Sequence, residues 1–371
     1  MNVALTELRR RPGRFVTAVG ILALLATLLM LLGGLLDGLI NGSTGALSAQ
    51  RGDVVVYSAT AQQSFPRSRI TPQTRAQVEA VDGVARVGGL GVAQLGARVP
   101  GNAARDLADV ALFGYQIPPA GVPRPPSAGQ AYADRTLESS GVTVGSTLEL
   151  GPARTPVKVV GWVDDLAYSG QGSLWSSADT WRQTVNANRP DAGLAAGVFQ
   201  ALVVQADAGT SPAALADRID RATAGATDSL TLAAAVAAIP GVEQQTSTFN
   251  QIIGVTVVIA VVVVALFFAL LTVERTGLYG VLKAIGATSG RLFVGVVLQA
   301  LVVTAIASLI GGTIAVVLAL VIPPGTIPYT LQPARVISSV LFLLVAAVLG
   351  CAFSLRRVLK IDPASAIGSA S

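Results

Sequence analysis

The stretch IIGVTVVIAVVVVALFFALLTV, residues 252–273, carries no charged side chain and is long enough to cross the hydrocarbon core of a bilayer as one α-helix. Three further apolar runs occupy residues 15–40, 292–322 and 336–353. Between the first run and the run at 252–273 lies a long region of mixed polar and apolar sequence. The mean hydropathy of +0.62 and the 13% of charged residues place the 371-residue chain among membrane proteins. The sequence therefore predicts four transmembrane helices and a large domain inserted between helices 1 and 2.

Basic residues gather in three short segments: Arg9, Arg10, Arg11 and Arg14; Arg275, Lys283 and Arg291; Arg356, Arg357 and Lys360. The same segments carry only Glu7, Glu274 and Asp362 as acids. By the positive-inside rule, both termini and the loop at 274–291 are cytoplasmic, and residues 41–250 are extracytoplasmic. The isoelectric point of about 9.7 thus reflects contacts with the lipid bilayer and its headgroups, and no nucleic-acid partner is expected.

This topology divides the chain into nine consecutive parts. They are a cytoplasmic amphipathic segment (1–14), helix 1 (15–40), the extracytoplasmic domain (41–250), helix 2 (251–273), a cytoplasmic loop (274–291), helix 3 (292–322), a short external loop (323–335), helix 4 (336–353) and a cytoplasmic tail (354–371). The first apolar run is too long for a typical cleaved signal peptide, so we expect a retained anchor.

The extracytoplasmic region alternates strand-like and helix-like segments, which predicts an α+β domain rather than a doubly wound sheet. Expected strands are 53–57, 86–96, 109–115, 147–150, 157–163 and 200–205, the pair at 147–163 forming a hairpin. Expected helices are 72–80, with Thr71 as N-cap, 136–140 and 212–222. From Leu230 the chain is rich in alanine, which favours a helical stalk leading into helix 2.

Enzymatic chemistry in this chain is not expected. Histidine is absent and the single cysteine, Cys351, lies in the last apolar run, so no metal site and no bound cofactor are predicted. The chain contains neither a P-loop nor a G-x-S-x-G motif. The neighbouring acids Asp164 and Asp165 would point to opposite faces of a strand, and Asp217 and Asp220 are typical of a solvated helix face.

The sequence of the loop that follows residue 273 predicts a short amphipathic helix. Tyr279, Leu282 and Ile285 recur at helical spacing and would form one apolar stripe. Arg275 and Lys283 could contact headgroups or acidic partner residues, and Gly286 could end the helix. Such a helix between two membrane spans can transmit force from a cytoplasmic protein, although an ordinary loop in the membrane interface fits the same pattern.

In this loop the chain resembles a known family. The segment ERTGLYGVLKAIGAT (274–288) resembles the coupling segment of the FtsX-like permease family, the membrane subunits of MacB-type ABC systems. Matching positions are Glu274, Arg275, Gly280, Leu282, Lys283, Ala284 and Gly286, while Leu278 stands where the family commonly has an acid. The segment RRVLKIDPASAIG (356–368) resembles the closing motif of the family through Arg356, Asp362, Pro363 and Ala366. The region 41–250 resembles the MacB-like periplasmic core domain of the family.

The resemblance implies a multi-pass protein of the cell (inner or plasma) membrane that forms a homodimer. Two copies of a separate ABC ATP-binding subunit would bind to the cytoplasmic loops, with Glu274, Arg275, Tyr279, Gly280, Leu282, Lys283 and Gly286 as coupling residues. ATP and magnesium would be used by that subunit alone. Its motion would reach the extracytoplasmic domain through the helices, a mechanism called mechanotransmission.

Two functional classes stay open from the sequence. The first is export or extraction (efflux) of a hydrophobic or amphipathic cargo, with heme as one candidate; Met30 and Asp37 are candidate cargo contacts, and Tyr57, Tyr115 and Tyr168 offer further oxygen ligands. For Met30 we favour a lipid-facing or dimer-packing role. The second class is a mechanotransmitting regulator of a cell-wall hydrolase or another external partner protein, with no transport.

Overall fold

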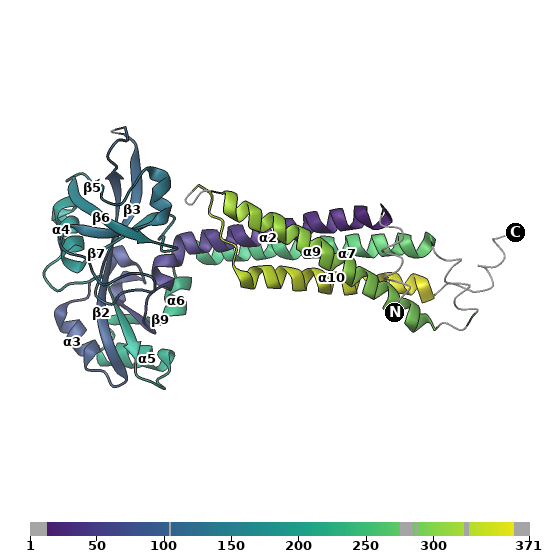
Figure 1. Cartoon of the computed structure of the whole chain (residues 1–371). Coiled ribbons are helices and arrows are strands. Elements are labelled where there is room, and N and C mark those ends of the chain that lie inside the picture. Colours follow the sequence, from purple (N-terminus) through teal and green to yellow (C-terminus); the bar gives the residue numbers. More distant parts are fainter. Residues whose placement is uncertain (1–12, 104, 275–284, 286–287, 323–325, 360–371) are drawn as a thin grey trace. The chain divides into compact units, whose positions relative to one another are not determined.

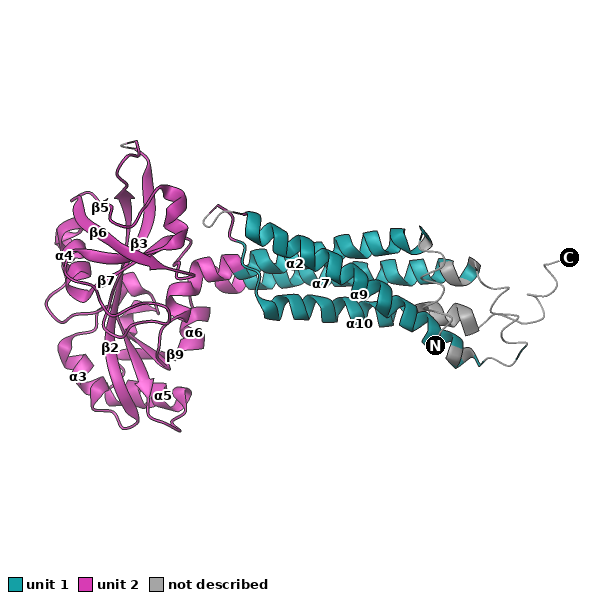
Figure 2. Cartoon of the chain, viewed as in Figure 1, with its two compact units in different colours: residues 1–37, 246–321, 329–371 teal, residues 38–245, 322–328 magenta. Residues whose placement is uncertain are grey.

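The computed structural model describes residues 13–103, 105–274, 285, 288–322 and 326–359 (Figure 1). The chain divides into two compact units, each described by itself (Figure 2). Unit 1 contains residues 1–37, 246–321 and 329–371, and unit 2 contains residues 38–245 and 322–328.

Unit 1 is built from four long helices: α2 (Gly13–Ser48), α7 (Val242–Glu274), α9 (Ser289–Val321) and α10 (Pro333–Leu359). Four segments of them are long and apolar enough to cross a membrane, namely Phe15–Ser48, Val242–Leu270, Leu292–Val321 and Pro333–Ala352. The predicted four-helix membrane architecture is therefore confirmed. Helices α2 and α7 contribute residues to both units.

Small residues allow the helices of unit 1 to approach closely. A Cβ atom built on Gly311 of α9 would lie 2.6 Å from Cβ of Ala26 and 2.8 Å from the carbonyl oxygen of Ala23, both on α2. A Cβ atom on Gly350 of α10 would lie 2.9 Å from the backbone nitrogen of Ala265 on α7. Because lipid tails are as apolar as the side chains, this kind of close packing is what holds membrane helices together.

All four helices are longer than the apolar runs that predicted them, and α2 and α7 extend into unit 2. Helix α2 runs to Ser48 although the apolar run ends near Ile40, because Asn41–Ser48 continues as small and polar residues that are packed within unit 2. Helix α7 begins at Val242, where Gly241 with φ of 88° separates it from the short helix α6 (Leu232–Ala237). The expected alanine-rich stalk is thus two helices with a break at Pro240–Gly241.

Unit 2 is built on a nine-stranded sheet in the order β3-β7-β4-β6-β5-β2-β8-β1-β9. The strands are β1 (Val54–Ser58), β2 (Val84–Arg98), β3 (Leu107–Tyr115), β4 (Gln130–Asp134), β5 (Thr147–Leu150), β6 (Thr155–Val163), β7 (Gly172–Ser177), β8 (Ala201–Ala206) and β9 (Thr227–Thr231). Strand β3 also pairs with β2, so part of the sheet closes on itself. The pairs β3–β7 and β4–β6 are parallel and the other pairs are antiparallel.

The helices of unit 2 beside α6 are α3 (Pro72–Glu79), α4 (Ala178–Asn188) and α5 (Pro212–Ala222), with the short turns η1 (Ala59–Ala61), η2 (Phe65–Arg67), η3 (Arg135–Ser140) and η4 (Pro190–Ala192). Successive side chains of β1 point to opposite faces of the sheet and enter two different cores. Val54 and Val56 belong to a core that contains Trp181 of α4, while Val55 and Tyr57 belong to a second core that contains Trp175. Gly91 and Gly114 lack the Cβ atoms that would overlap Trp181, so its indole lies directly on β2 and β3.

The α+β character of this domain and most of its elements agree with the sequence. Thr71 caps α3 by accepting a hydrogen bond from the backbone of Thr74 at 3.1 Å, and β5 and β6 form the expected antiparallel pair. The sequence did not indicate β4, β7, α4 or β9. These segments are rich in serine, threonine, alanine and aspartate. Pairing with neighbouring strands determines the structure of β4, β7 and β9, and packing of Trp181 on β2 and β3 positions α4.

Candidate functional site

Helix α2 carries the most concentrated set of candidate functional contacts, and those within unit 1 centre on Asp37. The carboxylate of Asp37 accepts hydrogen bonds from Nε of Arg335 at 3.0 Å and from Nη2 of Arg335 at 2.5 Å. The side chain of Asp37 is 9% exposed and that of Arg335 27% exposed. Both residues lie within the apolar segments, where an unpaired charge is costly, and the two-point geometry is the strong form of an arginine–carboxylate pair.

Two glycines make room for this ion pair. A Cβ atom on Gly33 would lie 2.6 Å from Cδ of Arg335, and a Cβ atom on Gly34 would overlap the ring of Tyr329. The backbone N–H of Thr330 donates to the carbonyl oxygen of Gly34 at 3.0 Å. The chain that enters α10 therefore lies directly against α2, and burial raises the pKa of Tyr329.

Met30 lies on the same face of α2 as Asp37, about two helical turns away, and is fully buried inside unit 1. Its sulfur is 3.7 Å from the position that a Cβ atom on Gly312 would occupy, so it packs against α9. The thioether is thus covered by the protein itself. In this conformation Met30 is enclosed by unit 1 and the carboxylate of Asp37 is bound by Arg335, so neither predicted cargo contact is an open ligand.

Within unit 2, the end of α2 is attached to residues 165–170, which we call the attachment loop. Backbone N–H groups of Ser169 and Gly170 donate to the carbonyl oxygens of Ser43 and Gly42 at 3.0 and 2.9 Å, and the N–H of Ala46 donates to Ala167 at 3.0 Å. A Cβ atom on Gly45 would lie 2.5 Å from the carbonyl oxygen of Asp165, so only glycine permits this approach. The helix end is held at successive points by main-chain hydrogen bonds.

The same helix end is also part of the domain's core. Ala46 and Leu47 of α2 are buried in the second core of unit 2, together with Val242 at the start of α7. Hydrogen-bonded attachment and apolar burial together fix the end of α2 to the sheet domain. Displacement of that helix end therefore requires movement of the domain core, because closely packed interiors transmit strain.

An acidic cluster flanks the attachment loop. Asp134 is fully buried and accepts hydrogen bonds from the backbone N–H groups of Thr136 at 2.9 Å and Leu166 at 2.7 Å. Asp164 is exposed and pairs with Arg135 at 2.6 Å. Partial burial, together with the negative charges of Asp134 and Asp164, raises the pKa of Asp165, while a hydrogen bond from Asn41 at 3.3 Å opposes that shift. These groups shape the loop and do not form a hydrolytic pair.

The tyrosines expected to offer external oxygen ligands lie inside the second core of unit 2. Tyr57, Tyr115 and Tyr168 are 1%, 1% and 8% exposed, and burial raises the pKa of each phenol. The hydroxyl of Tyr115 donates to the carbonyl oxygen of Pro123 at 2.8 Å. Trp175 and Trp181 are fully buried and pack within the two cores.

The predicted coupling residues fall largely outside the described residues. Glu274 is the last residue of α7, whereas Arg275, Tyr279, Gly280, Leu282, Lys283 and Gly286 lie outside the described part. Arg356 belongs to α10, and Asp362, Pro363 and Ala366 lie outside the described part. Their roles stay predictions.

Sequence reasoning missed Arg335 and the attachment loop. Arg335 is the only charged residue of the segment 323–335, and Asp37 is the only acid of the first apolar run. A lone acid and a lone base at the edges of two apolar runs were the signal that could have paired them. The attachment loop is held by backbone atoms, which leave little trace in a sequence.

Residues 250–363 match the family described as FtsX-like permease C-terminal. Together with the four apolar helices and the inserted domain, this match defines the chain as an ABC transporter permease, the class of subunit that works with a separate ATP-binding partner. The match confirms, over residues 250–363, the resemblance to the FtsX-like permease family that the two cytoplasmic motifs predicted.

Similar chains occur among named bacterial proteins. A Staphylococcus epidermidis protein named as a putative hemin transport system permease, HrtB, is 20% identical over 368 residues, which cover 99% of each chain. Its namesake in Staphylococcus haemolyticus is 30% identical over 111 residues, 30% of this chain and 31% of that protein. An uncharacterized ABC transporter permease of Mycobacterium tuberculosis is 34% identical over 112 residues, 30% of this chain and 31% of that protein.

Two solved structures are similar to part of the chain. The periplasmic region of MacB from Actinobacillus actinomycetemcomitans aligns with a TM-score of 0.35 and 10% identity, covering 50% of this chain and 92% of that one. The extracellular domain of YknZ from Gram-positive bacteria aligns with a TM-score of 0.33 and 14% identity, covering 49% of this chain and 99% of that one.

Proposed function

We propose that this permease couples ATP hydrolysis by its partner subunit to movement of the inserted domain, and that this movement drives export or extraction of a hydrophobic or amphipathic cargo. The observation that carries the proposal is the attachment of α2. Its residues Gly42–Ala46 are hydrogen-bonded to the attachment loop, and Leu47 is buried in the domain core. A helix fixed in this way transmits a displacement of its other residues to the domain rather than absorbing it.

The orientation follows the distribution of basic residues, with both termini and residues 274–291 in the cytoplasm and residues 41–250 outside. In this orientation the ATP-binding subunits, two per assembly, contact the segment that contains Tyr279 and Leu282. Cysteine-accessibility labelling from each side of the membrane tests the orientation. Labelling of a cysteine placed at Ala287 from the exterior would contradict it.

Apolar side chains on α7 are uncovered in the single chain. Val255, Ile259, Val262 and Leu266 recur at helical spacing and are 47–61% exposed in the single chain. A row of this kind faces either lipid or another helix. We assign it to the homodimer interface and to lateral entry of cargo from the bilayer beside α2 and α7.

Heme is the cargo to test first, because the full-length relative in Staphylococcus epidermidis is named as a putative hemin transport system permease. Coordination by Met30 in the described conformation finds no support, since its sulfur is packed against α9. If heme is the cargo, it is therefore held by other groups or in another conformation of unit 1.

The test is reconstitution of the permease with its ATP-binding subunit in liposomes. Under the proposal, ATP hydrolysis rises on addition of heme or another amphipathic cargo, and cargo leaves the membrane only when ATP is hydrolysed. The control replaces the P-loop lysine of the ATP-binding subunit. Hydrolysis that is insensitive to every cargo, combined with ATP-dependent binding of an external protein to residues 41–250, would favour the alternative, a regulator of an external hydrolase.

A further inference from the structure

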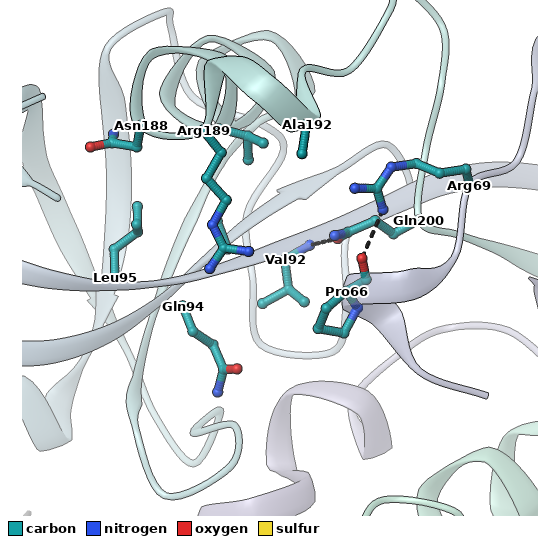
Figure 3. A pocket seen from close by; sticks show the side chains of 11 residues that line it. Pro66, Arg69, Val92, Gln94, Leu95, Asn188, Arg189, Ala192 and Gln200 are labelled. Carbon is teal, nitrogen blue, oxygen red and sulfur yellow. Dashed lines mark hydrogen bonds between the residues drawn. The ribbon is translucent and has the colours of Figure 1, made fainter. Parts of the chain in front are cut away.

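A cavity on unit 2 has a lining that the coupling mechanism does not use. It encloses about 90 Å³ between β2, the end of α4 and the segment that follows η2 (Figure 3). This volume corresponds to roughly three water molecules, which is the size of a small oxyanion group. Its floor and walls include the apolar side chains of Val92, Leu95 and Val185.

Two arginines from separate segments reach this cavity, Arg69 after η2 and Arg189 after α4 (Figure 3). The residues that line it include no aspartate or glutamate, and within the described part of the chain neither arginine forms an ion pair. Burial and the positive charge of Arg189 both lower the pKa of Arg69. Two like charges, that of Arg69 and that of the exposed Arg189, thus line one cavity without a counter-charge from its lining.

The guanidinium of Arg69 is oriented by the backbone. Its Nη1 donates to the carbonyl oxygens of Pro66 at 2.9 Å and Ser68 at 2.8 Å, while its Nη2 and Nε have no acceptor among the described residues. Gln200 is 5% exposed, and its Oε1 accepts a hydrogen bond from the backbone of Val92 at 2.6 Å. This bond fixes the amide so that its Nε2 stays available as a donor on the cavity wall.

We propose that this cavity binds an oxyanion, a phosphate or carboxylate group, between the guanidinium groups of Arg69 and Arg189 with Gln200 as a neutral donor. An oxyanion would offset the positive charges of the two arginines and accept the hydrogen bonds that the protein leaves unmade, and charge-assisted bonds of this kind are the strong ones. The apolar side chains beside the arginines suit a ligand whose oxyanion is joined to an organic body. The site shares no residue with the attachment loop or with α2.

Binding is tested by isothermal titration calorimetry on the full chain in nanodiscs, with inorganic phosphate and monobutyl phosphate as probes in low-salt buffer. We expect both probes to bind and Arg189→Gln to weaken binding about tenfold or more, as loss of one charge-assisted contact predicts. Tighter binding of monobutyl phosphate identifies an organic anion as the ligand, whereas equal binding identifies free phosphate. Either result supports the oxyanion site.

Arg124→Gln is the matched control, because Arg124 lies on an exposed loop outside the cavity lining. It should leave binding unchanged. In anion-free buffer, Arg189→Gln should not lower the melting temperature, since it removes a repulsion with Arg69; this distinguishes a ligand site from a structural role. Absence of binding up to about 50 mM probe, or equal binding by wild type and Arg189→Gln, would overturn the proposal.

Discussion

Arg335 at the start of α10 binds the carboxylate of Asp37 on α2 through two nitrogen atoms, with Nε 3.0 Å from Oδ2 and Nη2 2.5 Å from Oδ1. The two residues are far apart in the chain and lie on helices that Gly33 and Gly34 allow to approach closely. The pair fixes where α10 begins relative to α2. It also removes the only acid of the first apolar run from the set of open cargo ligands.

Replacing one partner of this ion pair should lower the stability of unit 1 more than the loss of the pair as a whole would suggest. Asp37→Asn or Arg335→Gln leaves a partly buried charge unpaired, and we expect each to destabilise unit 1 by about 1–3 kcal/mol. The double variant should lose less stability than the sum of the losses in the two single variants. Thermal unfolding in detergent measures all three. Additive losses would show that the two side chains do not depend on one another.

The main architecture could be predicted from the sequence because long apolar runs have few alternative structures in a membrane protein. The ends of α2 and α7 could not, because Asn41–Ser48 and Val242–Gln251 are polar enough to resemble a domain surface. The end of α2 is packed within unit 2, as is Val242 at the start of α7. Of the candidate site, the sequence indicates Asp37 alone. Its pairing with Arg335 and the backbone contacts of the attachment loop arise from tertiary structure.

Gly311 should tolerate no side chain. Gly311→Ala places a Cβ atom 2.6 Å from Cβ of Ala26 and forces α9 and α2 apart, for which we expect a loss of about 1–3 kcal/mol. Gly295→Ala on the same helix is the control, because nothing lies within 4 Å of the added atom. Its stability should be unchanged or slightly higher, since alanine is the better helix former. Equal thermal stability of the two variants would contradict the close-packing account.

Asp165 should make the stability of unit 2 depend on pH. Its pKa is raised in the folded protein, so the folded state binds more protons than the unfolded state once pH exceeds about 4, the usual carboxyl pKa. The contribution of Asp165 to stability is therefore fully present below that pH and is lost as pH rises through the raised pKa.

Asp165→Asn should remove this fall and stabilise unit 2 near neutral pH, since asparagine also tolerates the φ of 58° at this position. Asp164→Asn is the contrast, because it removes the ion pair with Arg135 instead. Melting temperatures measured between pH 4 and 8 provide the comparison. A constant difference between wild type and Asp165→Asn across this range would refute the prediction.

Replacing Tyr279 or Leu282 with aspartate should uncouple the ATP-binding subunit while the permease still inserts. A charge in the expected apolar stripe would disrupt its contact with that subunit. We expect cargo-stimulated ATP hydrolysis to fall at least tenfold, with membrane insertion unchanged by fractionation. Variants that retain subunit binding and full activity would show that the stripe is not the coupling surface.

Gly45 provides the most direct test of force transmission through α2. Gly45→Ala places a Cβ atom 2.5 Å from the carbonyl oxygen of Asp165, so the attachment loop must move away from the helix and its hydrogen bonds to Ser43 and Ala46 weaken. Gly42→Ala is matched in helix, residue type and neighbourhood, yet its added atom meets nothing within 4 Å. We expect Gly45→Ala to retain ATP hydrolysis in the reconstituted complex but to lose most cargo release, whereas Gly42→Ala behaves as wild type. Because both variants insert the same methyl group into α2, a difference between them reports the attachment itself rather than helix stability. Equal cargo release by the two variants would mean that the domain is driven through another connection, of which α7 is the alternative that also contributes residues to both units.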